Sequence, residues 1–496
     1  MNKFLALTAS FAACALAQTV PIPKVTPVAT TATSYPFLAA SHNVVPIDLA
    51  KAGYVEEEFI VSGNANVYDW APDGKLSVKA ANAPYATRIL VRRPSDPARF
   101  SGTALIELPN TARRADWAMM WGYTEEYLLE HGDAWIVVTM PGSLGGVKKF
   151  NPTRYADLSY ANPGACPAGA NGPSEIEEGL KWDALSQIGA ALKNKAVPGI
   201  NPQYLFMTTQ GGDIVAYINA IQESAKVYDG FMIKGPSGPG RINSCAPAIP
   251  KGDARLLIKD VGVPVISVVP QGEVADALAN RRPDSDTGKG GYRLYEIAGA
   301  AHIDKKAYVG LASVADQNAT GIPAQGTPDW PFNVRCTPEI QMSTHPLLGY
   351  MFDMTLANMD TWVRKGIPAP KAERMNVVQM QEGNGIQSAT QNMLVLDQFG
   401  NGTGGLRNVY VDVPTAKYFT TTPGPGTCRE LGYETPFDWP KLESIYGSSA
   451  NYAAKVNQSV DQMVKGHWLT ETDAKHIRST VMTSASNPRA TSASTR

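Results

Sequence analysis

The chain has 496 residues, which is enough to bury a large core in one elaborated α/β domain or in two domains. Its 44 Lys and Arg residues balance 45 Asp and Glu residues, for a net charge of −1, and hydrophobic residues make up 44%. This composition is ordinary for a globular protein, and the absence of a basic stripe or an acidic tail argues against nucleic acid as a partner.

The first residues have the layout of a secretory signal peptide. A positively charged start precedes a mostly apolar run from Phe4 to Leu16, and Ala15-Leu16-Ala17 matches the small-residue cleavage pattern. We therefore expect residues 1–17 to be removed. The run is too short to cross a bilayer, and no later run reaches the roughly 20 apolar residues of a membrane helix, so we expect no membrane association after cleavage.

Entry into the secretory route bears on the cysteines, of which Cys14 leaves with the signal peptide. An even number then remains in an oxidising compartment, which predicts two disulfides with three possible pairings. The spacing excludes the close C-x-x-C pattern of a zinc site. The four remaining cysteines are Cys166, Cys245, Cys336 and Cys428. Three sequons are candidates for glycosylation in the same compartment: Asn318, Asn401 and Asn457.

The mature chain divides by composition into a leader, one domain and a tail. Residues 18–45 are rich in Pro, Thr, Ala and Ser, which predicts an extended leader that lies on the surface or is disordered. Residues 481–496 are rich in Ser, Thr and Ala and predict a disordered tail. We assign residues 46–480 to a single domain with loop insertions.

Within that domain, β-rich runs alternate with helical patterns. This alternation predicts an α/β fold with a mainly parallel central sheet and helices on both faces. Long Pro- and Gly-rich loops at 141–175, 235–255 and 320–346 are expected to cover the active edge of the sheet. In chain order, the expected strands are 87–91, 104–108, 135–140, a strand that begins at Tyr204, 230–233, 264–269 and 292–297, and the expected helices are 117–130, 182–193 and 349–363.

The segment from Tyr204 to Asn219 predicts a strand, a tight turn and a helix, which is the layout that mounts a nucleophile in Gly-x-Ser-x-Gly turns. The turn here reads Met207-Thr-Thr-Gln-Gly211, so Thr209 stands where the serine would be. Met207 replaces the first glycine, and a β-branched residue with positive φ is costly. Thr209 acts as the nucleophile in this interpretation, with Thr208 as its neighbouring alternative. The alternative role for Thr209 is a hydrogen bond within the turn.

Two further residues complete a nucleophile, acid and histidine order. His302 follows the strand at 292–297 through a turn of small residues, and Glu273 ends the loop after the strand at 264–269. A carboxylate there would fix the imidazole tautomer and stabilise the imidazolium. Asp276 is the fallback for the acid. A structural histidine and a solvated loop carboxylate are the alternative interpretations.

Backbone N–H donors for an oxyanion are expected from the loops after two strands. The first is the amide of Gln210, directly after Thr209. The second lies in Leu108-Pro109-Asn110, where Pro109 has no N–H, so Asn110 would donate through its backbone or side chain. A turn-forming Asn110 is the alternative.

Asp116, Trp117 and Trp121 lie just beyond the Asn110 loop. Trp117 and Trp121 are four residues apart on one helical face. Either both pack in the core, or one of them faces the cleft and forms a flat apolar wall.

The chain resembles the alpha/beta hydrolase domain-containing family in ordered stretches that span about residues 50–420. The resemblance implies the α/β-hydrolase fold and a Gly-x-Ser-Gln turn, of which this chain keeps Gln210 and replaces the serine by Thr209. His302 matches the family's histidine after the strand, and Glu273 falls where an Asp or Glu is expected. The matching stretches are 53–59, 85–94, 116–123, 158–163, 228–231, 242–246, 298–302 and 410–416.

Together these patterns predict a secreted enzyme that hydrolyses an ester or lactone of a small organic molecule through Thr209, Glu273 and His302. We expect neither a metal nor an organic cofactor, and the oligomeric state is left open. Two alternatives stay open: an acid–base enzyme such as an isomerase or dehydratase, in which Glu273 and His302 do the chemistry, and a catalytically inactive binding protein.

Overall fold

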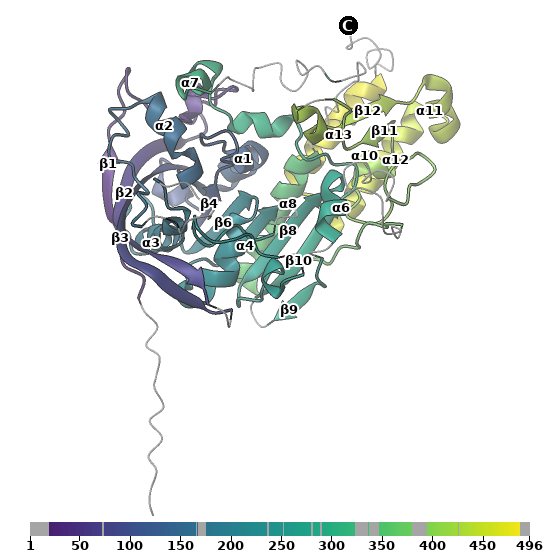
Figure 1. The fold of residues 1–496 in the computed structure, drawn as a ribbon. Helices are drawn as coiled ribbons and strands as arrows, with labels where there is room; N and C mark the ends of the chain where they lie inside the picture. The colour runs from purple at the N-terminus through teal and green to yellow at the C-terminus, as the bar shows by residue number, and fades with distance from the viewer. Residues whose placement is uncertain are drawn as a thin grey trace, which may run out of the picture.

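The fold is that of a computed structural model (Figure 1). It describes residues 19–71, 74–164, 166, 175–235, 238–250, 252–278, 281–287, 290–322, 336, 347–378, 394–424 and 426–486. The expected signal peptide at 1–17 lies outside these residues.

A ten-stranded sheet forms the centre of the molecule, in the order β1-β2-β3-β5-β4-β6-β7-β8-β10-β9. The pairs from β5 through β4, β6, β7 and β8 to β10 are all parallel, whereas β1, β2, β3 and β9 pair antiparallel. The expected mainly parallel sheet is thus confirmed for the central strands. Its strands are β1 (Lys24–Val28), β2 (Tyr54–Trp70), β3 (Leu76–Pro94), β4 (Thr103–Leu108), β5 (Ala134–Val138), β6 (Tyr204–Gln210), β7 (Gly230–Lys234), β8 (Pro264–Pro270), β9 (Ser285–Thr287) and β10 (Gly290–Ile297).

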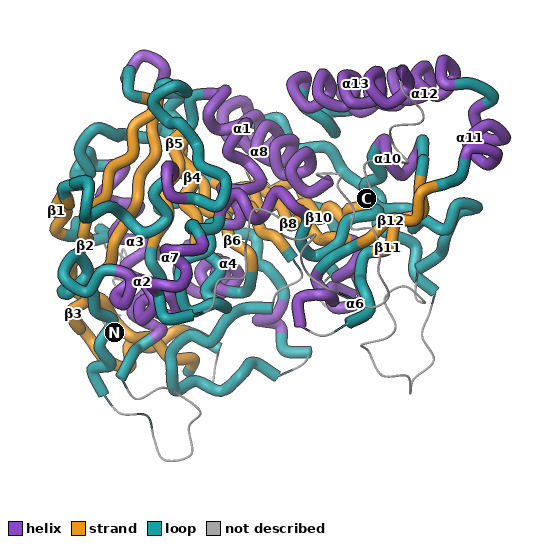
Figure 2. Tube along the Cα trace, turned by 90° about the horizontal axis from the view of Figure 1, so that it is seen from above, coloured by secondary structure: helices purple, strands orange, loops and turns teal. Residues whose placement is uncertain are grey.

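The central parallel strands are covered on both faces, because the helices that connect parallel strands pack on the sheet. β4, β5, β7, β8 and β10 are buried at every residue, which agrees with their nearly continuous apolar sequences. Figure 2 shows helices on both sides of this sheet, with α1 and α8 on one side and α3, α4 and α6 on the other. These helices are α1 (Met119–His131), α3 (Lys181–Lys193), α4 (Asp213–Tyr217), α6 (Val274–Ala277) and α8 (Leu347–Lys365).

Smaller elements surround this core. A two-stranded sheet pairs β11 with β12 antiparallel. The segment expected as a loop at 141–175 includes the short helix α2. The remaining elements are β11 (Ala416–Phe419), β12 (Tyr433–Pro436), α2 (Leu144–Phe150), α5 (Glu223–Ala225), α7 (Val314–Ala319), α10 (Val409–Asp412), α11 (Trp439–Tyr446), α12 (Ser449–Lys465) and α13 (Glu471–Ser486).

Both ends of the described chain belong to the domain, which corrects two expectations. The segment predicted as a leader at 18–45 contributes β1 to the sheet, and its residues 37–40 are buried in the core. The Pro- and Thr-rich composition of this segment led to the wrong prediction, although the short apolar stretch at 37–40 packs in the core. The expected tail at 481–496 begins as helix, because α13 continues to Ser486, and residues 487–496 lie outside the described part.

Two disulfides are present, and their pairing is Cys166 with Cys245 and Cys336 with Cys428. Of the three sequons, Asn318 and Asn457 are exposed. Asn401 is fully buried and its Oδ1 accepts a hydrogen bond from the Tyr418 N–H, so it is a poor glycosylation acceptor in the folded chain. Within the described ranges, no helix combines the length and the apolarity needed to cross a membrane.

Candidate active site

The turn after β6 differs from the expected arrangement. Thr209 stays in the extended strand, paired with Ile233 of β7, and the positive φ falls on Gly211, at 122°. A β-branched side chain disfavours positive φ, whereas glycine accepts it readily. β6 therefore continues to Gln210, the turn lies at Gly211 and Gly212, and α4 begins at Asp213.

Both threonines are therefore strand residues, and their hydroxyls lie in different surroundings. The buried Thr209 hydroxyl donates to the Leu108 carbonyl of β4 at 2.8 Å, which is the hydrogen-bonding role weighed as its alternative. Thr208 is also buried, and its hydroxyl has no hydrogen-bond partner among the described residues. In this arrangement the side chain of Gln210, not that of Thr209, contacts His302.

Gln210 lies between Asn110 and His302. Its Nε2 is 2.7 Å from His302 Nε2, and its Oε1 accepts a hydrogen bond from Asn110 Nδ2 at 3.1 Å. Since Asn110 donates to the Gln210 oxygen, the Gln210 nitrogen is the group that donates to His302. The Asn110 backbone N–H already donates to the Trp117 carbonyl at 3.0 Å, so only its side chain reaches the site.

His302 and Glu273 come from adjacent loops that are fastened to each other. Gln271 Oε1 accepts a hydrogen bond from the Gly299 N–H at 2.8 Å, and the Gly272 N–H donates to the Ala300 carbonyl at 3.1 Å. These bonds join the loop after β8 to the loop after β10. The result is a hydrogen bond between His302 Nδ1 and Glu273 Oε1. Asp276, the fallback acid, is exposed on α6.

The end of β7 makes room for the Glu273 carboxylate. Gly235 has a φ of 90°, and a Cβ there would lie 2.9 Å from Glu273 Oε2. A side chain at this position would therefore be strained and would also press on the carboxylate. Glycine is required here for both reasons.

Lys234, the last residue of β7, is fully buried behind Glu273. Its Nζ lies 3.8 Å from Glu273 Oε1. In the described part of the chain this ammonium nitrogen has no hydrogen-bond partner. Burial lowers the pKa of Lys234 to about 7, while the carboxylates of Asp304 and Glu430 act in the opposite direction. A nearly unpaired cation at the active edge is a feature that marks functional sites.

The surroundings of the imidazole favour its neutral form. Burial, and then the positive charge of Lys234, lower the pKa of His302 well below 6.5. With Gln210 donating to Nε2, the imidazole proton is on Nδ1, facing Glu273. This is the tautomer in which Nε2 accepts a proton during catalysis while the carboxylate stabilises the imidazolium that forms.

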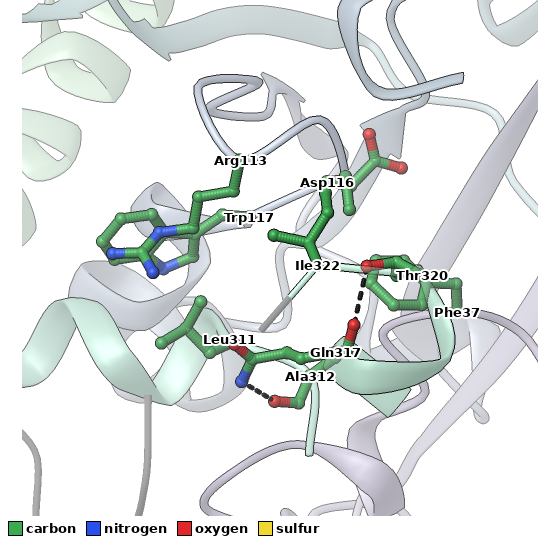
Figure 3. A pocket seen from close by; sticks show the side chains of 10 residues that line it. Phe37, Arg113, Asp116, Trp117, Leu311, Ala312, Gln317, Thr320 and Ile322 are labelled. Carbon is green, nitrogen blue, oxygen red and sulfur yellow. Dashed lines mark hydrogen bonds between the residues drawn. The ribbon is translucent and has the colours of Figure 1, made fainter. Parts of the chain in front are cut away.

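A cavity of about 380 Å³ opens at His302. Asn110, Arg113 and Trp117 form part of its wall, and Glu430 is the acidic residue of its lining. A second cavity is smaller, about 20 Å³. In its wall, Arg113 lies against the Trp117 ring (Figure 3). The two cavities share Arg113, Trp117 and Ile322.

Of the two alternatives for the tryptophans, the structure shows the one in which a single ring lies at the cavity, and that ring is Trp117. Trp117 is buried but lies at the cavity wall, where its Nε1 donates to the Ala307 carbonyl at 2.9 Å. Trp121 is in the core, 4.9 Å from Trp135, with Arg92 over its ring at 4.3 Å. Asp116 forms a buried ion pair with Arg88 at 3.0 Å.

Sequence reasoning missed Lys234 and Arg113. One signal for Lys234 was present, since a lysine that ends an apolar buried strand and precedes a glycine is unusual. For Arg113 the sequence offered no comparable signal, because its role depends on a ring four residues later and on a loop far along the chain.

The matches among solved structures include a CE15 glucuronoyl esterase from Teredinibacter turnerae T7901, at 10% identity over 56% of this chain and 74% of that one, with a TM-score of 0.28. An alpha-beta serine hydrolase homologue from Coxiella burnetii shares 10% identity over 52% of this chain and 97% of that one, with a TM-score of 0.26. The comparison with curated proteins found no match. A family model, described as an alpha/beta hydrolase domain, matches residues 24–479. The chain therefore belongs to the alpha/beta hydrolase domain family.

Proposed function

We propose that this hydrolase cleaves a carboxylic ester or lactone of a small molecule, with His302 and Glu273 acting as a general-base pair on a water molecule. The observation that carries the proposal is the pair of contacts made by His302, which lines the cavity: Nδ1 with Glu273, and Nε2 with the side-chain amide of Gln210. A neutral imidazole held in this way is a competent base.

In the proposed reaction, substrate and water enter the cavity and the Gln210 amide gives up its bond to His302. His302 Nε2 removes a proton from the water while the water oxygen bonds to the ester carbonyl carbon. Glu273 stabilises the imidazolium through Nδ1–H. The tetrahedral intermediate then collapses, its C–O bond to the leaving group breaks, and His302 returns the proton to the departing alkoxide. We expect the side-chain amides of Gln210 and Asn110, which adjoin His302, to donate to the oxyanion that develops.

A direct attack by Thr209 is the competing route to the same product. It requires the Thr209 hydroxyl to leave the Leu108 carbonyl, to which it donates at 2.8 Å, and to reach His302 past Gln210. The acyl group would then pass through a covalent enzyme ester. Thr208 would face the same obstacle from a position that is fully buried.

The test uses the full mature chain with p-nitrophenyl acetate, the Thr209→Val variant and a fluorophosphonate probe mapped by mass spectrometry. The water route predicts that Thr209→Val keeps activity within about threefold and that no threonine is labelled. Labelling of Thr209, with loss of activity in Thr209→Val, would favour the covalent route. Absence of ester turnover in the parent chain, over a panel of acyl sizes, would overturn hydrolysis itself.

An acid–base enzyme such as an isomerase or dehydratase is the second candidate. The observation that favours it is that an amide, and not a hydroxyl, contacts His302 Nε2. Such an enzyme would exchange the acidic C–H proton of a carbonyl compound with solvent deuterium in a His302-dependent way. Exchange without ester turnover would favour this candidate over hydrolysis.

We also propose that the protein is secreted, with residues 1–17 as its signal peptide. Two disulfides support this, because they persist in oxidising compartments. The exposed sequons at Asn318 and Asn457 are the sites we expect to be glycosylated in a eukaryotic host. N-terminal sequencing of the secreted chain tests the cleavage, and a start elsewhere than Gln18 would contradict it.

A further inference from the structure

Arg113 is the group at this site whose environment lacks an explanation in the proposed reaction. Its guanidinium carbon lies 4.6 Å from the centre of the Trp117 ring. Among the described residues, its buried Nη1 has no hydrogen-bond partner. A buried donor left without an acceptor is unfavourable, and a ligand that supplies an acceptor removes that penalty.

The loop that holds Arg113 is fixed before any ligand arrives. Asn110 and Trp117 exchange two backbone hydrogen bonds, at 3.0 and 3.2 Å, which close the loop at its base. Inside it, the Arg114 N–H donates to the Thr111 carbonyl at 2.8 Å, and the Arg114 carbonyl accepts from the Gly146 N–H at 3.0 Å. A guanidinium held on such a loop loses little freedom on binding an anion.

The charges around the cavity favour one negative charge. Arg113 and Arg114 line it together with Glu430, and His302 faces the same space. With the imidazole neutral, two cations and one carboxylate leave a net charge of +1. A carboxylate matches this balance better than a doubly charged phosphate, which the Glu430 side chain would repel more strongly.

We propose that the cavity binds a substrate bearing a carboxylate, which Arg113 holds while His302 reaches the ester bond of the same molecule. This inference rests on the proposed hydrolysis and names its substrate class: a small half-ester of a dicarboxylic acid, or an ester with a carboxylate on its alcohol part. The planar guanidinium suits a two-point contact with carboxylate oxygens. The cavity volume of about 380 Å³ restricts the ligand to a small molecule.

One experiment measures binding without catalysis. Benzoate is titrated into the full chain and its Kd is measured by calorimetry, with tryptophan fluorescence as a second signal because Trp117 lies against Arg113. We expect Arg113→Met to weaken benzoate binding by about tenfold or more, and Arg113→Lys to weaken it less. The matched control is Arg255→Met, which removes another arginine stacked on a tryptophan, at 5.3 Å from the Trp70 ring.

The kinetic arm compares monomethyl succinate with dimethyl succinate. Arg113→Met should lower kcat/KM about tenfold or more for the monomethyl ester and leave the neutral diester within about twofold. Equal losses on both esters, an unchanged benzoate Kd, or a clear preference for inorganic phosphate over benzoate would each overturn the inference. If Arg113→Met fails to fold, judged by circular dichroism, Arg113→Lys and Arg113→Gln are compared instead.

The two proposals fail in different ways. If the parent chain hydrolyses neutral esters but Arg113 has no effect on charged ones, the carboxylate inference is wrong and hydrolysis stands. If the parent chain hydrolyses no ester but binds benzoate through Arg113, the proposed hydrolysis is wrong and the carboxylate site stands.

Discussion

The two halves of the candidate site differ in how closely they follow the order expected for an alpha/beta hydrolase. On the β8 and β10 side, Glu273 and His302 follow their strands and are hydrogen-bonded to each other. On the β6 side, Thr209 stays in the strand and Gln210 occupies the position opposite His302. The Glu273 and His302 side of the site thus follows the expected order. On the β6 side, an amide stands where a nucleophile was expected.

The residue types in the turn after β6 agree with this arrangement. A serine tolerates the strained backbone of a nucleophile turn better than a β-branched threonine does. Here the positive φ falls on Gly211, where an added Cβ would meet no atom within 4 Å.

The largest effect on activity should come from the Glu273 and His302 side of the site. His302→Ala should lower kcat/KM for p-nitrophenyl acetate by about a thousandfold or more, because it removes the base. The matched control is His476→Ala, on the exposed side of α13, which should change the rate little. Equal rates for the parent chain and His302→Ala would show that the dyad is not the base.

Glu273→Gln should have the next largest effect, a loss of roughly a hundredfold in kcat. The amide keeps the shape of the carboxylate but loses the charge that stabilises the imidazolium. Asp276→Asn is the control, since Asp276 is an exposed carboxylate three residues away. A comparable loss in the Asp276→Asn variant would reassign the acid.

Lys234→Met should shift the pH profile with little change at high pH. His302 must be neutral to act, and the positive charge of Lys234 helps to hold its pKa below 6.5. Without that charge the pKa of His302 rises, so more of it is protonated at a given acidic pH and activity is lost at a higher pH than in the parent. Above the acidic limb we expect rates within about threefold.

The measurement is kcat/KM against pH, with Lys193→Met as the control because Lys193 pairs with Asp229, outside the cavity lining. An acidic limb that stays in place, or moves to lower pH, would contradict the role assigned to Lys234.

The smallest effects on rate should come from the two threonines of β6. Their variants should differ in the stability of the fold. Thr209→Val removes a hydroxyl that donates to the Leu108 carbonyl and should destabilise the fold by about 1 kcal/mol. Thr208→Val removes a buried hydroxyl without a partner in the described residues and should be neutral or stabilising. Denaturant midpoints test both. A large loss of activity in Thr209→Val would restore Thr209 as the nucleophile.

The sequence by itself predicted the parallel strands of the sheet and the edge at which Glu273 and His302 lie, but not the antiparallel strands β1, β2 and β9. Continuous apolar runs such as 264–270 form parallel strands only when both faces are covered, so their spacing between helical patterns was enough to predict the fold. The positions of Glu273 and His302 also followed from local sequence, because each lies directly after such a strand. Side chains that close a strand at one edge of a parallel sheet are brought together by the topology.

The tertiary structure decided what depends on backbone reversal and on contacts between distant segments. Gln210 and not Thr209 faces His302 because β6 stays extended through Gln210, with side chains alternating between faces, and the pattern of residue types does not specify where the strand ends. Lys234 ends β7 and Glu273 follows β8, so their contact depends on how these two strands pair. Arg113 meets Glu430 at a cavity wall only after the chain has folded, since more than half of the chain separates them. Such contacts arise from packing, and local sequence carries little information about them.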